Sequence, residues 1–223
     1  MFVPFLLLPL LAASLFLFIR ADFGTIVWKK TVTKSIASLL FVAIALLSYI
    51  VAGTDARFFF LLLVAQVFAM AGDVLLVYGE QKKAMFAAGL LSFLLTHIVL
   101  IVNFSTRAPF SLWDVLLWVA LVGGCLLAHR PSGIKLGDMK LPALVYLCAI
   151  SLMVSKAASL LYRGVFDLRG GLLAAVGAAL FMASDVFLLL YDFRQPREKA
   201  LRVANLITYY GGQALIALSV LYA

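Results

Sequence analysis

The sequence is poor in charged residues, cysteine and histidine. Of its 223 residues, 18 are Lys or Arg, 10 are Asp or Glu, 2 are Cys and 2 are His, whereas 65% are hydrophobic. A soluble domain of this length could not bury so much apolar surface, which excludes that class and indicates a polytopic membrane protein. Cys125 and Cys148 lie in or beside apolar runs, so we interpret them as packing residues and exclude a disulfide framework.

The apolar residues are gathered into eight runs, each long enough to cross a bilayer as a helix of about 20 residues. The connections between them are short, so we predict an all-α polytopic membrane protein with eight transmembrane helices in a single domain, residues 1–223. No basic residue precedes the first run, which is therefore expected to be a retained helix and not a cleaved signal peptide. The predicted helices cover residues 1–19, 33–52, 58–78, 84–103, 111–128, 141–162, 170–191 and 202–222.

Basic residues are divided unequally between the two sets of connections. Thirteen lie in or beside the connections after the first, third, fifth and seventh helices, and four lie on the opposite side. Since Lys and Arg accumulate on the cytoplasmic side, we expect a protein of the bacterial cytoplasmic membrane with both termini outside. The eighteenth, Lys156, lies near the outer end of the sixth helix and is expected to snorkel to the interface. The net charge of +8 thus reflects topology and does not imply binding of nucleic acid.

Two aspartates interrupt apolar runs in the same local pattern. Asp73 lies in the third predicted helix, and Asp185 lies in the seventh, 112 residues later. Between segments 68–78 and 180–190, five of eleven positions are identical. A carboxylate at membrane depth costs about 3 kcal/mol or more, so both are candidate functional residues. The alternative is that each makes only a structural hydrogen bond to a neighbouring helix.

The offset of 112 residues maps the first four predicted helices onto the last four. It also places Thr96-His97 on Thr208-Tyr209. We therefore predict a 4+4 parallel internal repeat, with halves 1–111 and 112–223 related by an axis along the membrane normal. In such a repeat, Asp73 and Asp185 lie at matching depths and can face each other.

Further polar residues are predicted to converge on the layer of the two aspartates, near the cytoplasmic end of the bundle. At about 1.5 Å per residue, Tyr146 and Tyr209 lie about 8 and 10 Å inside that end of their helices, and Lys34 lies at the end of its own. Three polar residues of the eighth helix, spaced at i, i+4 and i+8, form one stripe that could equally serve only to form hydrogen bonds to neighbouring helices. A single deep histidine, His97, more often packs than ligates. The supporting candidates are Lys34, Gln66, His97, Tyr146, Asn205, Tyr209 and Gln213.

Six segments in order along the chain form a recognisable set. They are Gly72-Asp73-Val74-Leu75-Leu76, Phe86-Ala87-Ala88-Gly89-Leu90, Phe93-Leu94-Leu95-Thr96-His97-Ile98, Leu141-Pro142-Ala143-Leu144-Val145-Tyr146, Gly177-Ala178-Ala179-Leu180-Phe181 with Ser184-Asp185, and Thr208-Tyr209-Tyr210 with Gln213. The set resembles the signature of the lysoplasmalogenase (YhhN-like) family of membrane proteins over nearly the whole chain. The Lys34 region resembles the family's Thr-Lys-Pro stretch, with Ser35 in place of proline.

The resemblance implies an eight-helix hydrolase that cleaves the vinyl ether bond of lysoplasmalogens. The products are a fatty aldehyde and glycerophosphocholine or glycerophosphoethanolamine. The substrate is thus a lysophospholipid taken from the membrane lipid, and no protein partner is implied.

The residues fit this chemistry independently. A vinyl ether is hydrolysed by protonation of its β-carbon, which creates an oxocarbenium ion that water then attacks. Such a site needs one carboxylic acid and one negative group, which two carboxyls in a low-dielectric layer can supply. We therefore predict Asp73 and Asp185 as the catalytic pair, with Asp73 as the acid and with no metal or other cofactor.

Two other functions fit parts of the pattern. A proton-coupled transporter could have duplicated halves and buried carboxylates, but the helices lack paired Gly or Pro interruptions at mid-membrane. A metal-dependent membrane lipid amidase needs several histidines, and the chain has only His97 and His129, which we place in a loop.

Overall fold

All regular structure in the described part of the chain is helical. The computed structural model describes residues 2–53, 55–79, 81–129, 133–134 and 136–223. Within these ranges the chain forms eight α-helices, three short 3₁₀ turns and no strand, which confirms the all-α prediction. The helices are α1 (Leu7–Asp22), α2 (Val27–Ala52), α3 (Ala56–Gly79), α4 (Lys83–Arg107), α5 (Leu112–His129), α6 (Lys140–Tyr162), α7 (Leu168–Phe193) and α8 (Lys199–Ser219), and the turns are Val3–Leu6, Gly137–Met139 and Val220–Tyr222.

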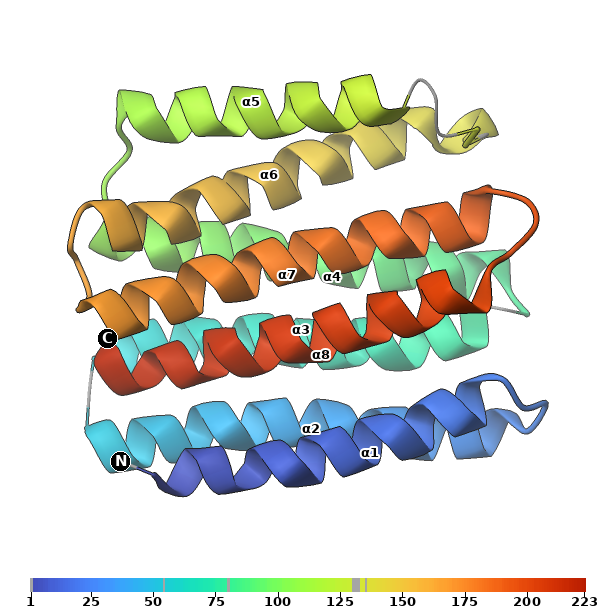
Figure 1. Cartoon of the computed structure of the whole chain (residues 1–223), viewed down its shortest axis with the longest axis horizontal. Coiled ribbons are helices and arrows are strands. Elements are labelled where there is room, and N and C mark those ends of the chain that lie inside the picture. The colour runs from blue at the N-terminus through green and yellow to red at the C-terminus, as the bar shows by residue number, and fades with distance from the viewer. Residues whose placement is uncertain (1, 54, 80, 130–132, 135) are drawn as a thin grey trace.

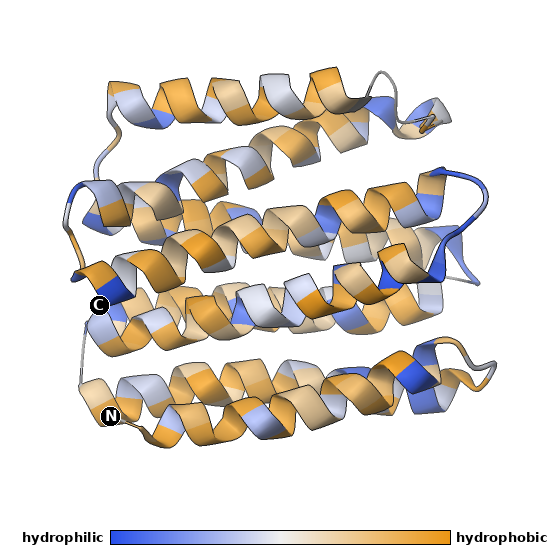
Figure 2. Cartoon of the chain, in the orientation of Figure 1, coloured by the Kyte–Doolittle hydropathy of each residue, from blue (hydrophilic) through white to orange (hydrophobic). Residues whose placement is uncertain are grey.

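The helices run side by side and reverse direction from each one to the next (Figure 1). The α1–α2, α3–α4, α5–α6 and α7–α8 connections lie at one end of the bundle, which we name the basic end (Figure 1). Both termini lie at the opposite end, named the terminal end. Hydrophobic residues cover the helices between the two ends, and hydrophilic residues are most frequent at the basic end (Figure 2).

Seven helical segments of the described chain are long and apolar enough to cross a membrane, which supports a multi-pass membrane protein. The apolar stretch of α5, Leu112–Ala128, is shorter. At about 1.5 Å per residue it covers about 25 Å, slightly less than a bilayer core of about 30 Å. Assignment of the basic end to the cytoplasm stays a prediction from the distribution of Lys and Arg.

The helix pairs α3–α4 and α7–α8 make the most extensive packing contacts. Helix α2 packs against α3 and α8, and α6 packs in the same way against α7 and α4. Helix α5 lies at the edge of the bundle and packs mainly against α6 (Figure 1). The packing therefore recurs after four helices, as a duplication would produce, although the 4+4 repeat itself stays a prediction.

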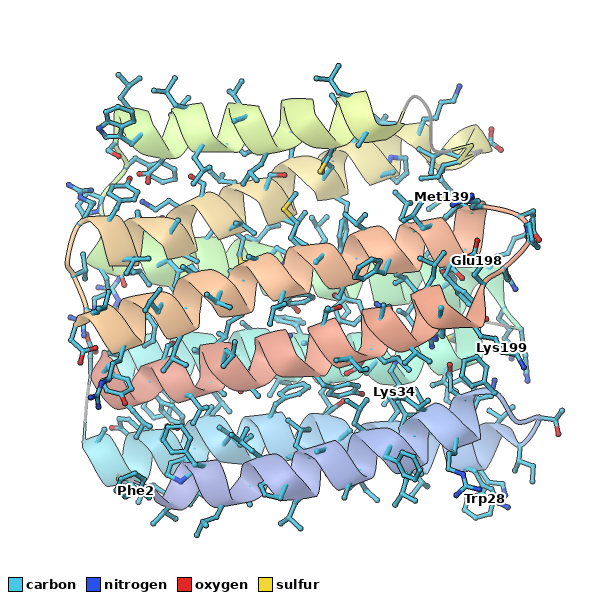
Figure 3. All side chains as sticks on the ribbon, in the orientation of Figure 1. Phe2, Trp28, Lys34, Met139, Glu198 and Lys199 are labelled. Atoms are coloured by element: carbon cyan, nitrogen blue, oxygen red, sulfur yellow. The ribbon has the colours of Figure 1, made fainter. Side chains whose placement is uncertain are left out.

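A difference from the predicted boundaries that matters for the site concerns α2, which begins at Val27 and not at residue 33. The prediction began the helix at residue 33, after the charged Lys29 and Lys30, but lysine is a good helix former and does not stop a helix. Lys34 consequently lies about 10 Å inside α2. Its side chain is only 3% exposed and lies within the bundle (Figure 3), which corrects its placement at the helix end. Similarly, His129 is the last residue of α5 and not a loop residue.

Helices α7 and α8 approach closely where two glycines face each other. A Cβ atom built on Gly212 would lie 2.7 Å from the carbonyl oxygen of Gly177, and one built on Gly177 would lie 2.9 Å from that of Gly212. By contrast, the nearest atom to a Cβ built on Gly211 is 3.9 Å away. The Gly177–Gly212 contact therefore sets the spacing of the two helices that carry Asp185 and Tyr209.

We expect Gly212→Ala to destabilise the protein by about 1–3 kcal/mol, because the added methyl group must push α8 away from α7. Gly211→Ala is the matched control and should be neutral or slightly stabilising, since alanine favours helix over glycine. Thermal unfolding of both variants in detergent measures the difference. Equal melting temperatures would show that this contact does not set the helix spacing.

Candidate active site

A cavity of about 560 Å³ is bounded chiefly by α4, α6 and α7. Its walls are mostly leucine, phenylalanine and other apolar side chains, and its size is typical of small-molecule sites. Six of the nine predicted site residues line it, together with two charged residues that were not predicted from the sequence. The polar and charged residues that line the cavity are Lys34, Asp73, Tyr146, Asp185, Asp192, Arg202, Asn205 and Tyr209.

Asp73, on α3, is held by three other helical side chains. Lys34 Nζ lies 3.2 Å from its Oδ1 atom, and Oδ2 accepts hydrogen bonds from Ser38 Oγ at 2.6 Å and from the Tyr209 hydroxyl at 2.8 Å. Asp73 is 1% exposed and Lys34 is 3% exposed. The Asp73 carboxyl is therefore oriented by one basic side chain and two hydrogen-bond donors, all from other helices. Ser38 was missed, although it follows Lys34 by one helical turn.

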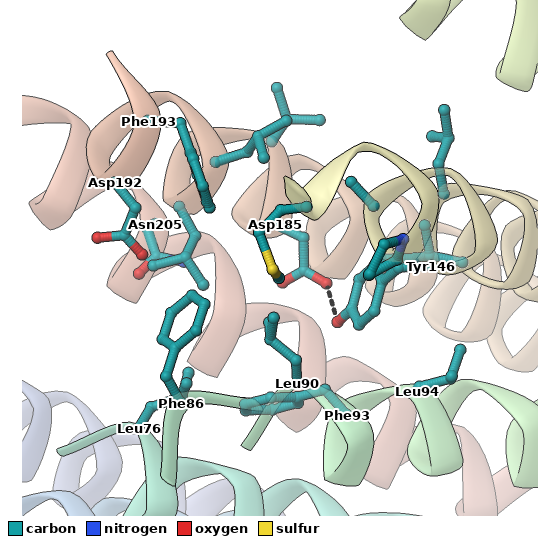
Figure 4. Close-up of a pocket in the computed structure, with 18 of the residues that line it drawn as sticks. Leu76, Phe86, Leu90, Phe93, Leu94, Tyr146, Asp185, Asp192, Phe193 and Asn205 are labelled. Carbon is teal, nitrogen blue, oxygen red and sulfur yellow. Dashed lines mark hydrogen bonds between the residues drawn. The ribbon is translucent and has the colours of Figure 1, made fainter. Parts of the chain in front are cut away.

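Asp185, on α7, has a different set of partners. Its Oδ2 atom accepts a hydrogen bond from the Tyr146 hydroxyl at 2.6 Å, as Figure 4 shows. His97 Nε2 lies 2.9 Å from the same hydroxyl oxygen and 3.5 Å from Asp185 Oδ2. Ser184 Oγ lies 3.2 Å from Asp185 Oδ1. Among the described ion pairs, Asp185 pairs with His97 and with no Lys or Arg.

The two aspartates have partners at corresponding positions of the predicted halves. Lys34 corresponds to Tyr146 by the offset of 112 residues, and each contacts the aspartate of its own half. His97 corresponds to Tyr209 by the same offset, and each contacts the aspartate of the other half. The contacts are therefore related as a duplicated site would be, while the side chains differ: Lys34 is a cation where Tyr146 is a neutral phenol.

Three predicted site residues do not line the cavity. His97 is fully buried behind Tyr146, and its Nδ1 atom has no described hydrogen-bond partner. Gln66 Nε2 lies 3.5 Å from the backbone oxygen of Gln213, so these two residues lie together.

Asn205 does line the cavity, and its Nδ2 atom donates to the backbone oxygen of Ser184 at 2.9 Å, which ties α8 to α7 beside Asp185.

The structure also reveals an ion pair beside the cavity that sequence reasoning missed. Arg202 Nε and Nη2 contact the two carboxylate oxygens of Asp22 at 2.8 and 3.1 Å, and Arg202 Nη1 donates to Asn205 Oδ1 at 3.2 Å. Arg202 had been counted with the loop cations because it opens the predicted eighth helix. The partners are 180 residues apart, so no local spacing could indicate the pair.

A second buried ion pair lies away from the cavity and corrects the interpretation of Lys156. Its side chain is fully buried, and Nζ lies 2.6 Å from the backbone oxygen of Ala108 and 3.1 Å from Asp114 Oδ2. Tyr162 also donates a hydrogen bond to Asp114. Lys156 therefore does not snorkel, because a carboxylate inside α5 neutralises it in place. The sequence did contain a signal for this ion pair, because the carboxylate of Asp114 lies within the predicted apolar run 111–128.

No three His, Cys, Asp or Glu side chains in the described ranges are arranged so that they could hold one metal ion. The prediction that no metal or other cofactor is needed stays a prediction, and it is tested below.

The comparison with known proteins bears on the whole site. The model of the YhhN family matches residues 29–220, a range that contains Lys34, Asp73, Tyr146, Asp185 and Tyr209. No curated protein and no solved structure shows significant similarity to the chain. Because the family model covers most of the sequence and every helix that contributes to the cavity, the chain belongs to the YhhN family.

Proposed function

We propose that this protein is a lysoplasmalogenase that hydrolyses the vinyl ether bond of single-chain plasmalogens by acid catalysis. The observation that carries the proposal is that Asp73 and Asp185 line one apolar cavity in different electrostatic surroundings. Family membership is consistent with a hydrolase. The cavity is also suited to one hydrocarbon chain because most of its lining is aliphatic or aromatic.

The surroundings favour Asp185 as the general acid in place of Asp73, which the sequence analysis chose. Asp73 is bound to Lys34 at 3.2 Å, and a proton there would break a buried ion pair. Asp185 has no described Lys or Arg partner, and its polar neighbours are Tyr146, His97 and Ser184. Of the two aspartates, only Asp185 can carry a proton without breaking a described ion pair with Lys or Arg.

The reaction balances with one water molecule. The Asp185 carboxyl gives its proton to the β-carbon of the vinyl ether, and the ether oxygen and the adjacent α-carbon share the resulting positive charge. Water adds to the α-carbon while the Asp185 carboxylate takes a proton from that water. The hemiacetal then collapses, with cleavage of its carbon–oxygen bond to glycerol and transfer of the hydroxyl proton to the departing oxygen. Asp185 is thus regenerated in each turnover.

Asp73 and the tyrosines support the charged intermediate. The Asp73 carboxylate lines the same cavity and supplies negative potential toward the oxocarbenium ion. Tyr209, bonded to Asp73, and Tyr146, bonded to Asp185, fix the directions of the two carboxyl groups. Because the Tyr146 proton goes to Asp185, its oxygen accepts the hydrogen of His97 Nε2, which positions the tyrosine.

The test is release of fatty aldehyde from lysoplasmalogen by the purified protein in detergent, with and without EDTA. We expect aldehyde to form at the same rate in both, since the proposed step needs only carboxyl groups and water. Detergent abolishes any ion gradient, so a proton-coupled transporter gives no aldehyde. Loss of activity with EDTA and recovery with zinc would instead favour a metal-dependent lipid hydrolase such as an amidase.

A further inference from the structure

The end of the cavity nearest the basic end of the bundle, which we name the mouth, is lined by Asp192 and Arg202, two charged residues that the proposed chemistry does not use. Asp192 lies seven residues after Asp185 on α7, which places it on the same helix face and about 10 Å nearer the basic end. It lines the cavity with Arg202 and Asn205 of α8. Figure 4 shows Asp192 beside Asn205 at one end of the site and Tyr146 at the other, with Asp185 between them.

Arg202 is fixed in place at this mouth. The two contacts with Asp22 and one with Asn205 orient the guanidinium, which carries five N–H donors in total. Arg202 and Asp192 both line the cavity. The mouth therefore carries an anion from α7 and an oriented cation from α8.

We propose that Asp192 and Arg202 form the head-group subsite, in which Arg202 binds the phosphate and Asp192 binds the ammonium of a zwitterionic lysolipid. The choice of ligand rests on the proposed function. A zwitterion can lie antiparallel to the Asp192–Arg202 pair, so that each charge meets its opposite. A head group with phosphate alone leaves Asp192 facing negative charge, and a simple alkyl amine makes no use of the N–H donors of Arg202 that Asp22 and Asn205 leave free.

The spacing agrees with this assignment. The separation of about 10 Å between Asp185 and Asp192 along α7 is comparable to an extended glycerophosphoethanolamine chain, measured from the ether oxygen to the nitrogen. A lipid with its ammonium at Asp192 can therefore place its vinyl ether at Asp185 and its hydrocarbon chain among the leucines of α4 and α6. Asp192 is in this sense a specificity-determining residue.

The test measures binding with lipids that cannot react. Saturated 1-O-alkyl lysophospholipids lack the double bond that is protonated, and two of them, with phosphoethanolamine and phosphoglycerol heads, differ mainly in the ammonium group. We expect wild-type protein to bind the ethanolamine lipid about fivefold more tightly, as for a partly exposed ion pair. Asp192→Asn should reduce this ratio to about one, and Asp192→Lys should invert it.

Glu198→Gln is the matched control, because Glu198 is an exposed acidic residue at the same end that does not line the cavity. It should keep the wild-type ratio. An Asp192→Asn variant that folds, binds and keeps the wild-type preference would overturn the proposal, as would a wild type with no preference. Failure of the proposed function is a separate result: it shows as absence of aldehyde from lysoplasmalogen while the head-group preference persists.

Discussion

Replacement of Asp185 by asparagine is expected to lower the turnover of lysoplasmalogen at least about a hundredfold, the smaller loss typical when general acid catalysis is removed. Asparagine keeps the shape of the side chain and can still accept the hydrogen bond from Tyr146, but it has no acidic proton to give to carbon. Stability and binding of a saturated alkyl lysolipid should therefore stay close to the wild-type values. Aldehyde release and inhibitor binding, measured on the same preparation, check both parts.

The chemical step itself offers a second measurement for Asp185. Proton transfer to carbon should slow in deuterated water, so the wild-type turnover should show a solvent deuterium isotope effect. Tyr146→Phe keeps the acid and removes only a positioning hydrogen bond, so it should lose less activity than Asp185→Asn. A folded Asp185→Asn variant with nearly wild-type turnover would show that Asp185 is structural and that the acid lies elsewhere.

Replacement of Asp73 by asparagine is expected to harm both stability and turnover. Lys34 is buried, and loss of its partner leaves an uncompensated charge, which typically costs about 3–5 kcal/mol. The double variant Lys34→Gln/Asp73→Asn removes both charges and should recover most of the lost stability, because no unpaired ion remains.

Turnover should not recover in that double variant if the Asp73 carboxylate stabilises the oxocarbenium ion. Thermal unfolding and aldehyde release, compared across the two single variants and the double variant, separate the two roles of Asp73. Recovery of both stability and activity in the double variant would mean that the Lys34–Asp73 pair only supports the fold. The catalytic site would then consist of Asp185 and its partners alone.

The sequence allowed much of this site to be predicted, because an ionisable residue inside an apolar run is costly and therefore conspicuous. Asp73 and Asp185 were found in this way, and counting residues from the helix ends brought Tyr146 and Tyr209 to the same layer. The structure places both tyrosines in contact with the aspartates. Helix periodicity and rise were sufficient here because these four residues lie on regular helices.

The remainder depended on information that helix periodicity does not contain. Arg202 and Asp22 are each near a helix end, where a charge is normally solvated, and only packing of α1 against α8 makes them partners. Gln213 shares the stripe of Asn205 and Tyr209, but the cavity does not extend to it. Periodicity predicts which residues share a helix face, and it does not predict how far along that face a cavity reaches.

The charges at the mouth bear on how products leave, because Arg202 and Asp192 lie there while most of the remaining lining is leucine, phenylalanine and other apolar side chains. Under the proposed reaction, cleavage divides an amphiphile into a water-soluble phosphodiester and a lipophilic aldehyde. The phosphodiester forms beside Arg202 and Asp192 and is released to the aqueous phase, whereas the aldehyde forms against the apolar wall and partitions into the bilayer. The two products therefore go to different phases, and under the proposed reaction the reactive aldehyde enters the membrane and not the surrounding solution.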